Sequence, residues 1–450
     1  MNLLSERNIA RALVAAVILS IFVAALTFTG VIGGRSRTKI EAAYSPDGAS
    51  LLLASFRDID GWRSDAIGDA IEPFLRSCAR LEKLPDDAPM NASEYLGPGV
   101  PDGATLAGRV GDWRRVCAEA AVIAARPYAD DSARASGARS FFEYYFRPVK
   151  LHQRLAPEWG GSDAILDPKG RFTGYFEPFY EASAFRTAEF SAPVYARPAD
   201  LVMIDLGRFR PELSGTRIAG RIVDGALDPY PDHAAINGGA LAGRARVLAY
   251  MRPSDLLFLQ IQGSGRLRLA EGELRLGYDG ANGRVYTAIG RTLIEMGALT
   301  KENVSMQTIR AWLDKAPDDA ARKVRESNES FVFFRVLDTL PDGKLGPPGA
   351  EGVQLTPGRS LAVDPRYVAY GAPVFISIPG DEARRRLPVR RLMIAQDTGG
   401  AIKGPVRGDI FVGSGPLAGR VAGAFNEMGE MYALVPQPLA DRLAAESKSR

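Results

Sequence analysis

The sequence predicts a mainly β protein with an α-helical N-terminal region. Two observations lead to this fold class. Between residues 65 and 151, apolar side chains recur at helical spacing, whereas from about residue 170 short β-type runs alternate with Gly, Pro and Asp turns. With 450 residues, the chain is long enough for two or three compact units.

The chain begins with an apolar segment. Residues 12–33 carry no charge, and as a helix they are long enough to span a hydrocarbon core of roughly 30 Å. A cleaved signal peptide has a shorter apolar region of roughly 7 to 15 residues, although Val23-Ala24-Ala25 would serve as a cleavage site. We therefore assign residues 1–36 to an export signal that remains as a membrane anchor, and a cleaved soluble form is the alternative.

Helices dominate the expected structure of residues 37–155. Helical spacing marks residues 65–84, 112–126 and 140–151, and the aromatic side chains among them are expected to be core. Cys78 and Cys117 would form a disulfide in an oxidising compartment, or remain two buried thiols. In the β-rich part, two further helices are expected at Tyr286–Met296 and near Val304–Lys323.

Composition excludes several function classes. The chain has two histidines and two cysteines, too few for a multi-cysteine zinc site or an iron–sulfur cluster, and histidine-based catalysis is nearly excluded. A net charge of +3 is too small for a typical nucleic-acid binder. We therefore expect no metal, no cofactor and no nucleic-acid partner, and chemistry that runs on carboxylates.

Three aspartates stand at the ends of apolar β-runs beside Gly or Pro, namely Asp364, Asp397 and Asp409. Strand alternation puts Phe411 on the same face as Asp409, and desolvation there would raise the pKa of this carboxyl and keep it protonated as a general acid. The amides that follow Asp397 would hold it ionised or let it orient a neighbour. Turn capping is the alternative for these aspartates, and it is strongest for Asp364.

Three stretches are candidates for a binding groove. One of them, residues 278–291, is a Gly-rich turn that enters a helix and could bind an anion. The other two contain the candidate site residues. Tyr175 and Glu177 lie in an aromatic cluster at residues 173–180 that would stack on sugars and bind hydroxyls, with core packing as the alternative. Residues 257–265 are expected to form a strand that places Gln260 and Gln262 on one face before a turn at Ser264 and Gly265, residues suited to neutral hydroxyl or N-acetyl groups. A solvent-facing strand is the alternative.

The sequence resembles the membrane-bound lytic murein transglycosylases of the A type. The resemblance covers roughly residues 160–437 and rests on long motifs in the same order, which are TGYFEP, FLQIQGSGRL, YDGANGRVYTAIGR, GVQLTPGRSLAVDPRYVAYGAPVFI, QDTGGAIKG and RGDIFVGSG. Two features depart from the better-known members. The N-terminal segment has no cysteine for lipidation, and one extra residue separates Asp397 from Asp409.

This resemblance implies a double-psi β-barrel and a second β-rich domain, separated by a groove for glycan strands. The implied domains are a substrate-binding β domain over residues 156–330, a catalytic barrel over 331–437 and a C-terminal tail over 438–450. Asp409 corresponds to the catalytic aspartate of the family, and Asp397 lies beside it in the same motif block. Asp364 corresponds to the first of three motif aspartates, and we expect it to contact the substrate.

The implied activity is cleavage of peptidoglycan between N-acetylmuramic acid and N-acetylglucosamine, with formation of 1,6-anhydromuramic acid. Asp409 would act first as acid and then as base. A hydrolase that uses two carboxyls and a non-catalytic glycan-binding protein are the alternatives. The protein would then be periplasmic and tethered to the inner membrane by residues 12–33, with cell-wall synthesis or division proteins as candidate partners.

Overall fold

A computed structural model describes residues 39–40, 49–90, 107–155, 165–210, 213, 217–338, 340–381 and 386–448. The predicted membrane anchor at residues 12–33 lies outside these ranges. Within them, the structure contains no helix with the length and hydropathy needed to cross a bilayer.

Six strands close into a β-barrel. They follow the order β19, β16, β17, β15, β18 and β5, and the ring closes because β5 also pairs with β19. Three further strands, β3, β2 and β1, extend the sheet beyond β19, and β4 pairs with β3. The bounds of these strands are β1 Lys39–Ile40, β2 Ser50–Leu53, β3 Phe146–Leu155, β4 Ile165–Asp167, β5 Lys169–Glu177, β15 Ser360–Val363, β16 Pro373–Ile378, β17 Val389–Asp397, β18 Gly408–Ser414 and β19 Asn426–Pro436.

Helices from both ends of the chain pack against the barrel sheet. One hydrophobic core contains buried side chains from residues 51–151 and from residues 361–440. A disulfide joins Cys78 to Cys117, so the first of the two alternatives for these cysteines is confirmed. The bounds of these helices are α2 Ile71–Leu81, α3 Gly111–Ala125, α4 Asp131–Tyr145, α10 Gly415–Ala424 and α11 Gln437–Lys448.

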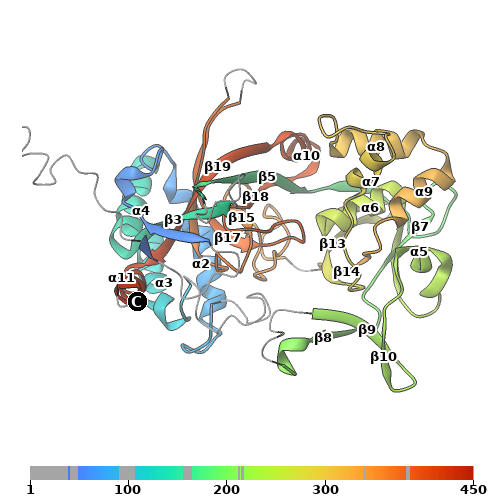
Figure 1. The fold of residues 1–450 in the computed structure, drawn as a ribbon. Coiled ribbons are helices and arrows are strands. Elements are labelled where there is room, and N and C mark those ends of the chain that lie inside the picture. The colour runs from blue at the N-terminus through green and yellow to red at the C-terminus, as the bar shows by residue number, and fades with distance from the viewer. Residues whose placement is uncertain are drawn as a thin grey trace, which may run out of the picture. The chain divides into compact units, whose positions relative to one another are not determined.

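The segment between β5 and β15 forms the second β-rich domain. Its strands make a four-stranded sheet (β14-β13-β12-β6), a three-stranded sheet (β10-β9-β8) and a pair (β11-β7). Helices α6 to α9 belong to the same segment, and Figure 1 shows them beside its strands. The strand bounds are β6 Phe179–Glu181, β7 Ala192–Tyr195, β8 Val202–Asp205, β9 Arg217–Val223, β10 Ala226–Pro229, β11 Val247–Met251, β12 Ser264–Leu269, β13 Gly272–Ala281 and β14 Val332–Val336; the helices are α5 His233–Ala235, α6 Pro253–Gln262, α7 Ile289–Glu295, α8 Met306–Lys315 and α9 Asp318–Glu326.

Several expected elements differ from the observed ones. The helix expected over 140–151 ends at Tyr145, and the chain continues as β3 with Pro148 inside the strand. The helix expected near 304–323 is two helices, α8 and α9, because Pro317 interrupts the helical hydrogen bonding between them. The residues assigned to a C-terminal tail include helix α11, in which Leu439 and Ala440 are buried.

The sheet also crosses the domain boundaries that we drew from the sequence. β3 falls in the region expected to be helical, and β5 falls in the expected substrate-binding domain, yet both pair with β19 of the barrel sheet. Segments far apart in the sequence therefore build the barrel together.

Candidate active site

Neighbouring barrel strands place Asp397 and Asp409 in one row. Ala362 of β15 pairs with Asp397 of β17 on one side and with Asp409 of β18 on the other. Because adjacent strands lie roughly 4.8 Å apart and the barrel sheet curves, the Cα atoms of the two aspartates are at most about 10 Å apart. Thr173 of β5 pairs with Asp409 on the next strand. Thr173 and Tyr175 lie two residues apart on β5 and therefore share a face, and their hydroxyls donate to Asp409 and Asp397, so the two carboxyls lie on the same side.

Asp409 is an enclosed acid with few direct partners. The Thr173 hydroxyl donates to Asp409 Oδ1 at 2.7 Å, and Arg407 Nη2 donates to the same hydroxyl at 2.7 Å. Burial raises the pKa of Asp409 to about 6; the Thr173 hydrogen bond and the Arg407 charge oppose this rise, and the Asp397 charge adds to it. The predicted effect of desolvation is confirmed. A carboxyl with this pKa holds a proton in mildly acidic solution, as a general acid requires.

Asp397 is held by three donors. The Tyr175 hydroxyl donates to Oδ2 at 2.7 Å, while the amides of Ala350 and Thr398 donate to Oδ1 at 2.8 and 2.9 Å. The amide donation that we expected after Asp397 is present. The pKa of Asp397 is nevertheless raised, because burial outweighs these hydrogen bonds. Both oxygens of this carboxyl are therefore occupied by protein groups.

Asp364 lies directly after β15 and is 1% exposed. Its carboxylate pairs with Arg366 at 2.6 Å and accepts a hydrogen bond from the Gly404 amide at 2.8 Å. It also accepts from the Arg366 amide two residues ahead, as a turn-capping aspartate does. These contacts join the loop after Asp397 to the end of β15. The predicted contact between Asp364 and substrate remains a prediction.

Glu177 is completely buried at the end of β5. Its oxygens accept hydrogen bonds from Arg275 at 2.6 Å, from Arg266 at 3.1 Å and from Ser414 at 2.7 Å. The residue therefore ties β12 and β13 to the end of β18. We predicted that Glu177 binds sugar hydroxyls, and this enclosed ion-pair network does not support that role. Tyr175 contacts Asp397 directly, and its predicted contact with sugar remains a prediction.

The expected strand at Leu257–Gly265 is wrong over residues 257–262, which belong to helix α6. Residues two apart on a helix do not share a face, so Gln260 and Gln262 diverge. Gln260 is 7% exposed, and neither of its amide atoms has a hydrogen-bond partner among the described residues. Gln262 Oε1 accepts from the Phe176 amide at 3.4 Å, which connects α6 to β5.

Ser264 and Gly265 open β12 directly after α6. Gly265 is buried, and a Cβ atom there would lie 2.6 Å from Leu259 Cδ1, so glycine permits close packing against α6. Ser264 is partly exposed. Their predicted role in sugar binding remains a prediction.

Comparison with known proteins identifies the family. Residues 171–335 match the MltA specific insert domain, and residues 359–435 match the 3D domain. The crystal structure of a membrane-bound lytic murein transglycosylase from Agrobacterium tumefaciens is similar, with a TM-score of 0.68 and 32% identity, covering 87% of this chain and 99% of that one. This chain belongs to the MltA family.

Two comparisons with Escherichia coli MltA support this assignment. Membrane-bound lytic murein transglycosylase A of Escherichia coli is 32% identical over 274 residues, which are 60% of this chain and 66% of that protein. The crystal structure of E. coli MltA with bound chitohexaose has a TM-score of 0.51 and 26% identity, covering 72% of this chain and 84% of that one. The predicted fold class, a double-psi β-barrel with a second β-rich domain, is confirmed.

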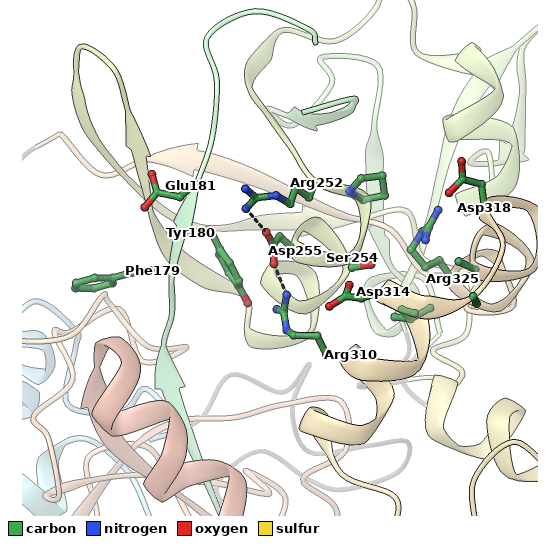
Figure 2. Close-up of a pocket in the computed structure, with 14 residues that line it drawn as sticks. Phe179, Tyr180, Glu181, Arg252, Ser254, Asp255, Arg310, Asp314, Asp318 and Arg325 are labelled. Carbon is green, nitrogen blue, oxygen red and sulfur yellow. Dashed lines mark hydrogen bonds and ion pairs between the residues drawn. The ribbon is translucent and has the colours of Figure 1, made fainter. Parts of the chain in front are cut away.

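The MltA insert domain also contains a pocket of about 760 Å³, shown in Figure 2. It lies among β6, the start of α6, and helices α8 and α9. Asp255 lies between Arg252 and Arg310 and pairs with both. Phe179 and Tyr180, from the aromatic cluster predicted at residues 173–180, line this pocket, whereas none of the individually predicted site residues does.

Sequence reasoning did not single out three residues around the two carboxyls of the candidate site, Thr173, Arg407 and Ala350. Thr173 and Arg407 belong to the motifs TGYFEP and RGDIFVGSG, but the sequence did not indicate that they contact Asp409 or each other. Ala350 acts through its backbone amide, for which no side-chain signal exists. Within the described residues, no group of three or more His, Cys, Asp or Glu side chains could hold a metal ion.

Proposed function

We propose that this protein is a lytic transglycosylase that cleaves the β-1,4 bond between N-acetylmuramic acid and N-acetylglucosamine in peptidoglycan. The pairing of two unlike carboxyls in one row carries the proposal. Asp409 accepts a hydrogen bond from one side chain, and its pKa is raised to about 6, whereas Asp397 is held by three donors. Asp409 is thus suited to exchange protons, whereas Asp397 is held in a fixed position by its hydrogen bonds.

The reaction needs one group that acts first as a general acid and then as a general base. Protonated Asp409 donates its proton to the glycosidic oxygen as the bond to the muramoyl anomeric carbon breaks. The resulting carboxylate then takes the proton of the muramoyl 6-hydroxyl, whose oxygen attacks the anomeric carbon and closes the 1,6-anhydro ring. Arg407, which acts on Asp409 through its charge and through Thr173, stabilises the carboxylate between these steps.

Asp397 favours this mechanism over hydrolysis by two carboxyls. A hydrolase needs a second carboxyl that is free to activate water or to attack the sugar. The oxygens of Asp397 already accept from Tyr175, Ala350 and Thr398, so most of the acceptor positions of this carboxyl are used by the protein. We assign Asp397 to orienting Tyr175 and to adding negative charge beside the reacting sugar.

Relatives support the substrate and the location. E. coli MltA binds chitohexaose, a glycan oligomer, and relatives are named membrane-bound. We propose that this protein acts on glycan strands in the periplasm and is tethered to the inner membrane by residues 12–33.

Substitution of Asp409 tests the proposal. Asp409→Asn and Asp409→Ala should lower turnover of isolated sacculi by at least ~10², because no second group shares the proton transfers. Glycan binding, measured with chitohexaose, should persist. Near-normal cleavage by Asp409→Ala would contradict the assignment and point to Asp397.

A further inference from the structure

A tight turn at residues 349–352 supplies one of the donors that hold Asp397. The turn is closed by a hydrogen bond from the Gly352 amide to the Gly349 carbonyl at 2.8 Å, and Gly352 has a φ of +88°. The Ala350 amide donates to Asp397 Oδ1 at 2.8 Å. The next amide, that of Glu351, donates to the Gln396 carbonyl at 3.1 Å. The position of this turn therefore decides one hydrogen bond of the active site.

The side chain of Glu351 points from this turn into the protein and is buried. The residue is 5% exposed, and its Oε2 accepts from the Ser77 hydroxyl of helix α2 at 2.7 Å. Its Oε1 lies 3.8 Å from Arg80 Nη1 on the same helix and accepts no hydrogen bond within the described part of the chain. Gly371 leaves room for this carboxyl, because a Cβ atom there would lie 3.2 Å from Oε1.

Helix α2 offers a fixed support for Glu351. Gln396, the residue before Asp397, donates through Nε2 to the Ser77 hydroxyl at 2.9 Å and to the Pro73 carbonyl at 2.8 Å. The disulfide at Cys78, next to Ser77, ties α2 to α3. Ser77 therefore connects two segments that each lead directly to Asp397, one through Gln396 and the other through Glu351.

We propose that Glu351 is a positioning residue, which holds the 349–352 turn against helix α2 through Ser77 so that the Ala350 amide points at Asp397. The expected effect of Glu351 on turnover rests on the proposed function. Its expected effect on the hydrogen bond between the Ala350 amide and Asp397 does not.

The cost of burying Glu351 supports a task for it. Burial raises the pKa of this carboxyl to about 7, while the Ser77 hydrogen bond and the Arg80 charge oppose the rise. In the unfolded chain the group would ionise at a lower pH, so its ionised form is disfavoured by folding. A buried carboxyl with one hydrogen bond is an expensive way to fill space, since an apolar side chain would fill the same volume without this penalty.

Titration of Asp397 tests the inference directly. Asp397 would be observed by NMR in protein labelled with ¹³C at the aspartate carboxyls and assigned by comparison with Asp397→Asn. Glu351→Gln and Glu351→Ala both remove the charge, but only Gln keeps an oxygen that accepts from Ser77. Their difference therefore isolates the hydrogen bond. We expect the Asp397 midpoint to lie at higher pH in Glu351→Ala than in Glu351→Gln, because a displaced Ala350 amide stabilises the carboxylate less.

Kinetics provide the second readout. Glu351→Ala should lower kcat roughly tenfold or more with KM unchanged, as expected for misplaced catalytic groups, and Glu351→Gln should restore most of it. Ser77→Ala removes only a hydroxyl and should shift the Asp397 midpoint in the same direction as Glu351→Ala. Ser77 also accepts from Gln396, so this variant supports the inference only together with the Glu351 variants. Glu351→Leu, which fills the volume but offers no acceptor to Ser77, replaces Glu351→Ala if that variant does not fold.

The control is Glu430→Ala. It removes a carboxylate on β19 that pairs with Lys150 of β3 at 2.7 Å. It should leave the Asp397 midpoint unchanged. Equal midpoints in the Gln and Ala variants, or an equal shift in the control, would overturn the inference. An inactive wild-type protein would defeat the proposed function, and the NMR titration would still decide the role of Glu351.

Discussion

The protonation of Asp409 is decided by four opposing influences on a single carboxyl. Burial and the Asp397 charge raise its pKa, while Thr173 and Arg407 lower it. The result, a pKa of about 6, lies in the range where a group can serve as acid and then as base without a large penalty in either step. Small changes to its neighbours should therefore move the pH range in which the protein is active.

This balance predicts opposite pH shifts for two variants. Because the first step needs protonated Asp409, kcat/KM should fall as the pH rises through the pKa of this group. Arg407→Met removes a charge that lowers the pKa of Asp409, so the fall should move to higher pH. Asp397→Asn removes a charge that raises it, so the fall should move to lower pH. Arg407→Lys serves as the control because it keeps the charge, and shifts of the same sign in the two test variants would contradict this account.

Single residues show what the sequence could predict of the site. The raised pKa of Asp409 was predictable because strand alternation between Asp409 and Phe411 is a local property. The hydrogen bond from Tyr175 to Asp397 was not, because it joins residues 222 apart in the chain. Local periodicity carries no information about which strands become neighbours in a barrel.

At the scale of elements, helix α6 shows why apolar and polar alternation led to the wrong prediction of a strand. Residues 257–262 read Leu-Phe-Leu-Gln-Ile-Gln, and a helix that is buried on most sides has no amphipathic pattern to recognise. The informative signals were at its ends. Pro253 occupies the first turn, and Gly263 ends the helix in the left-handed conformation with a φ of +75°.

The two glutamines of α6 should now behave differently. Gln260→Leu should raise the free energy of unfolding by roughly 1–2 kcal/mol, because it removes a buried amide without partners, and it should leave glycan affinity unchanged. Gln262→Ala should weaken glycan affinity if this residue meets the substrate as predicted. Urea unfolding and chitohexaose titration measure both quantities. A loss of affinity in a stable Gln260→Leu protein would show that the buried amide reaches the substrate.

At the scale of the molecule, the N-terminal helices and the barrel are one folding unit. They share a hydrophobic core, and the Asp65–Arg359 ion pair at 2.8 Å is buried between them. The sequence indicated helices in this region but not their packing, since nothing in an amphipathic pattern states which surface covers the apolar face. The arrangement brings Ser77 of α2 into contact with Gln396, the residue before Asp397.

The disulfide should contribute to the stability of this whole unit. Cys78 and Cys117 are 39 residues apart, and closing a loop of this length in the unfolded chain corresponds to roughly 3–4 kcal/mol. The Cys78→Ala/Cys117→Ala double variant should therefore unfold at a lower urea concentration than the oxidised protein. A reducing agent should lower the midpoint of the wild-type protein but not that of the variant. Equal midpoints for the oxidised protein and the double variant would show that the cross-link does not stabilise the fold.

The chemical nature of the released muropeptides tests the central claim most directly. Attack by the muramoyl 6-hydroxyl is intramolecular, so it should outcompete water if the site holds the sugar correctly. Mass spectrometry of sacculi digested in ¹⁸O-labelled water should therefore show products that end in 1,6-anhydromuramic acid, lighter by one water than hydrolysis products, without label and without a new reducing end. Labelled, reducing products would contradict the transglycosylase assignment even if Asp409 proved essential, because both cleavage mechanisms need an acid.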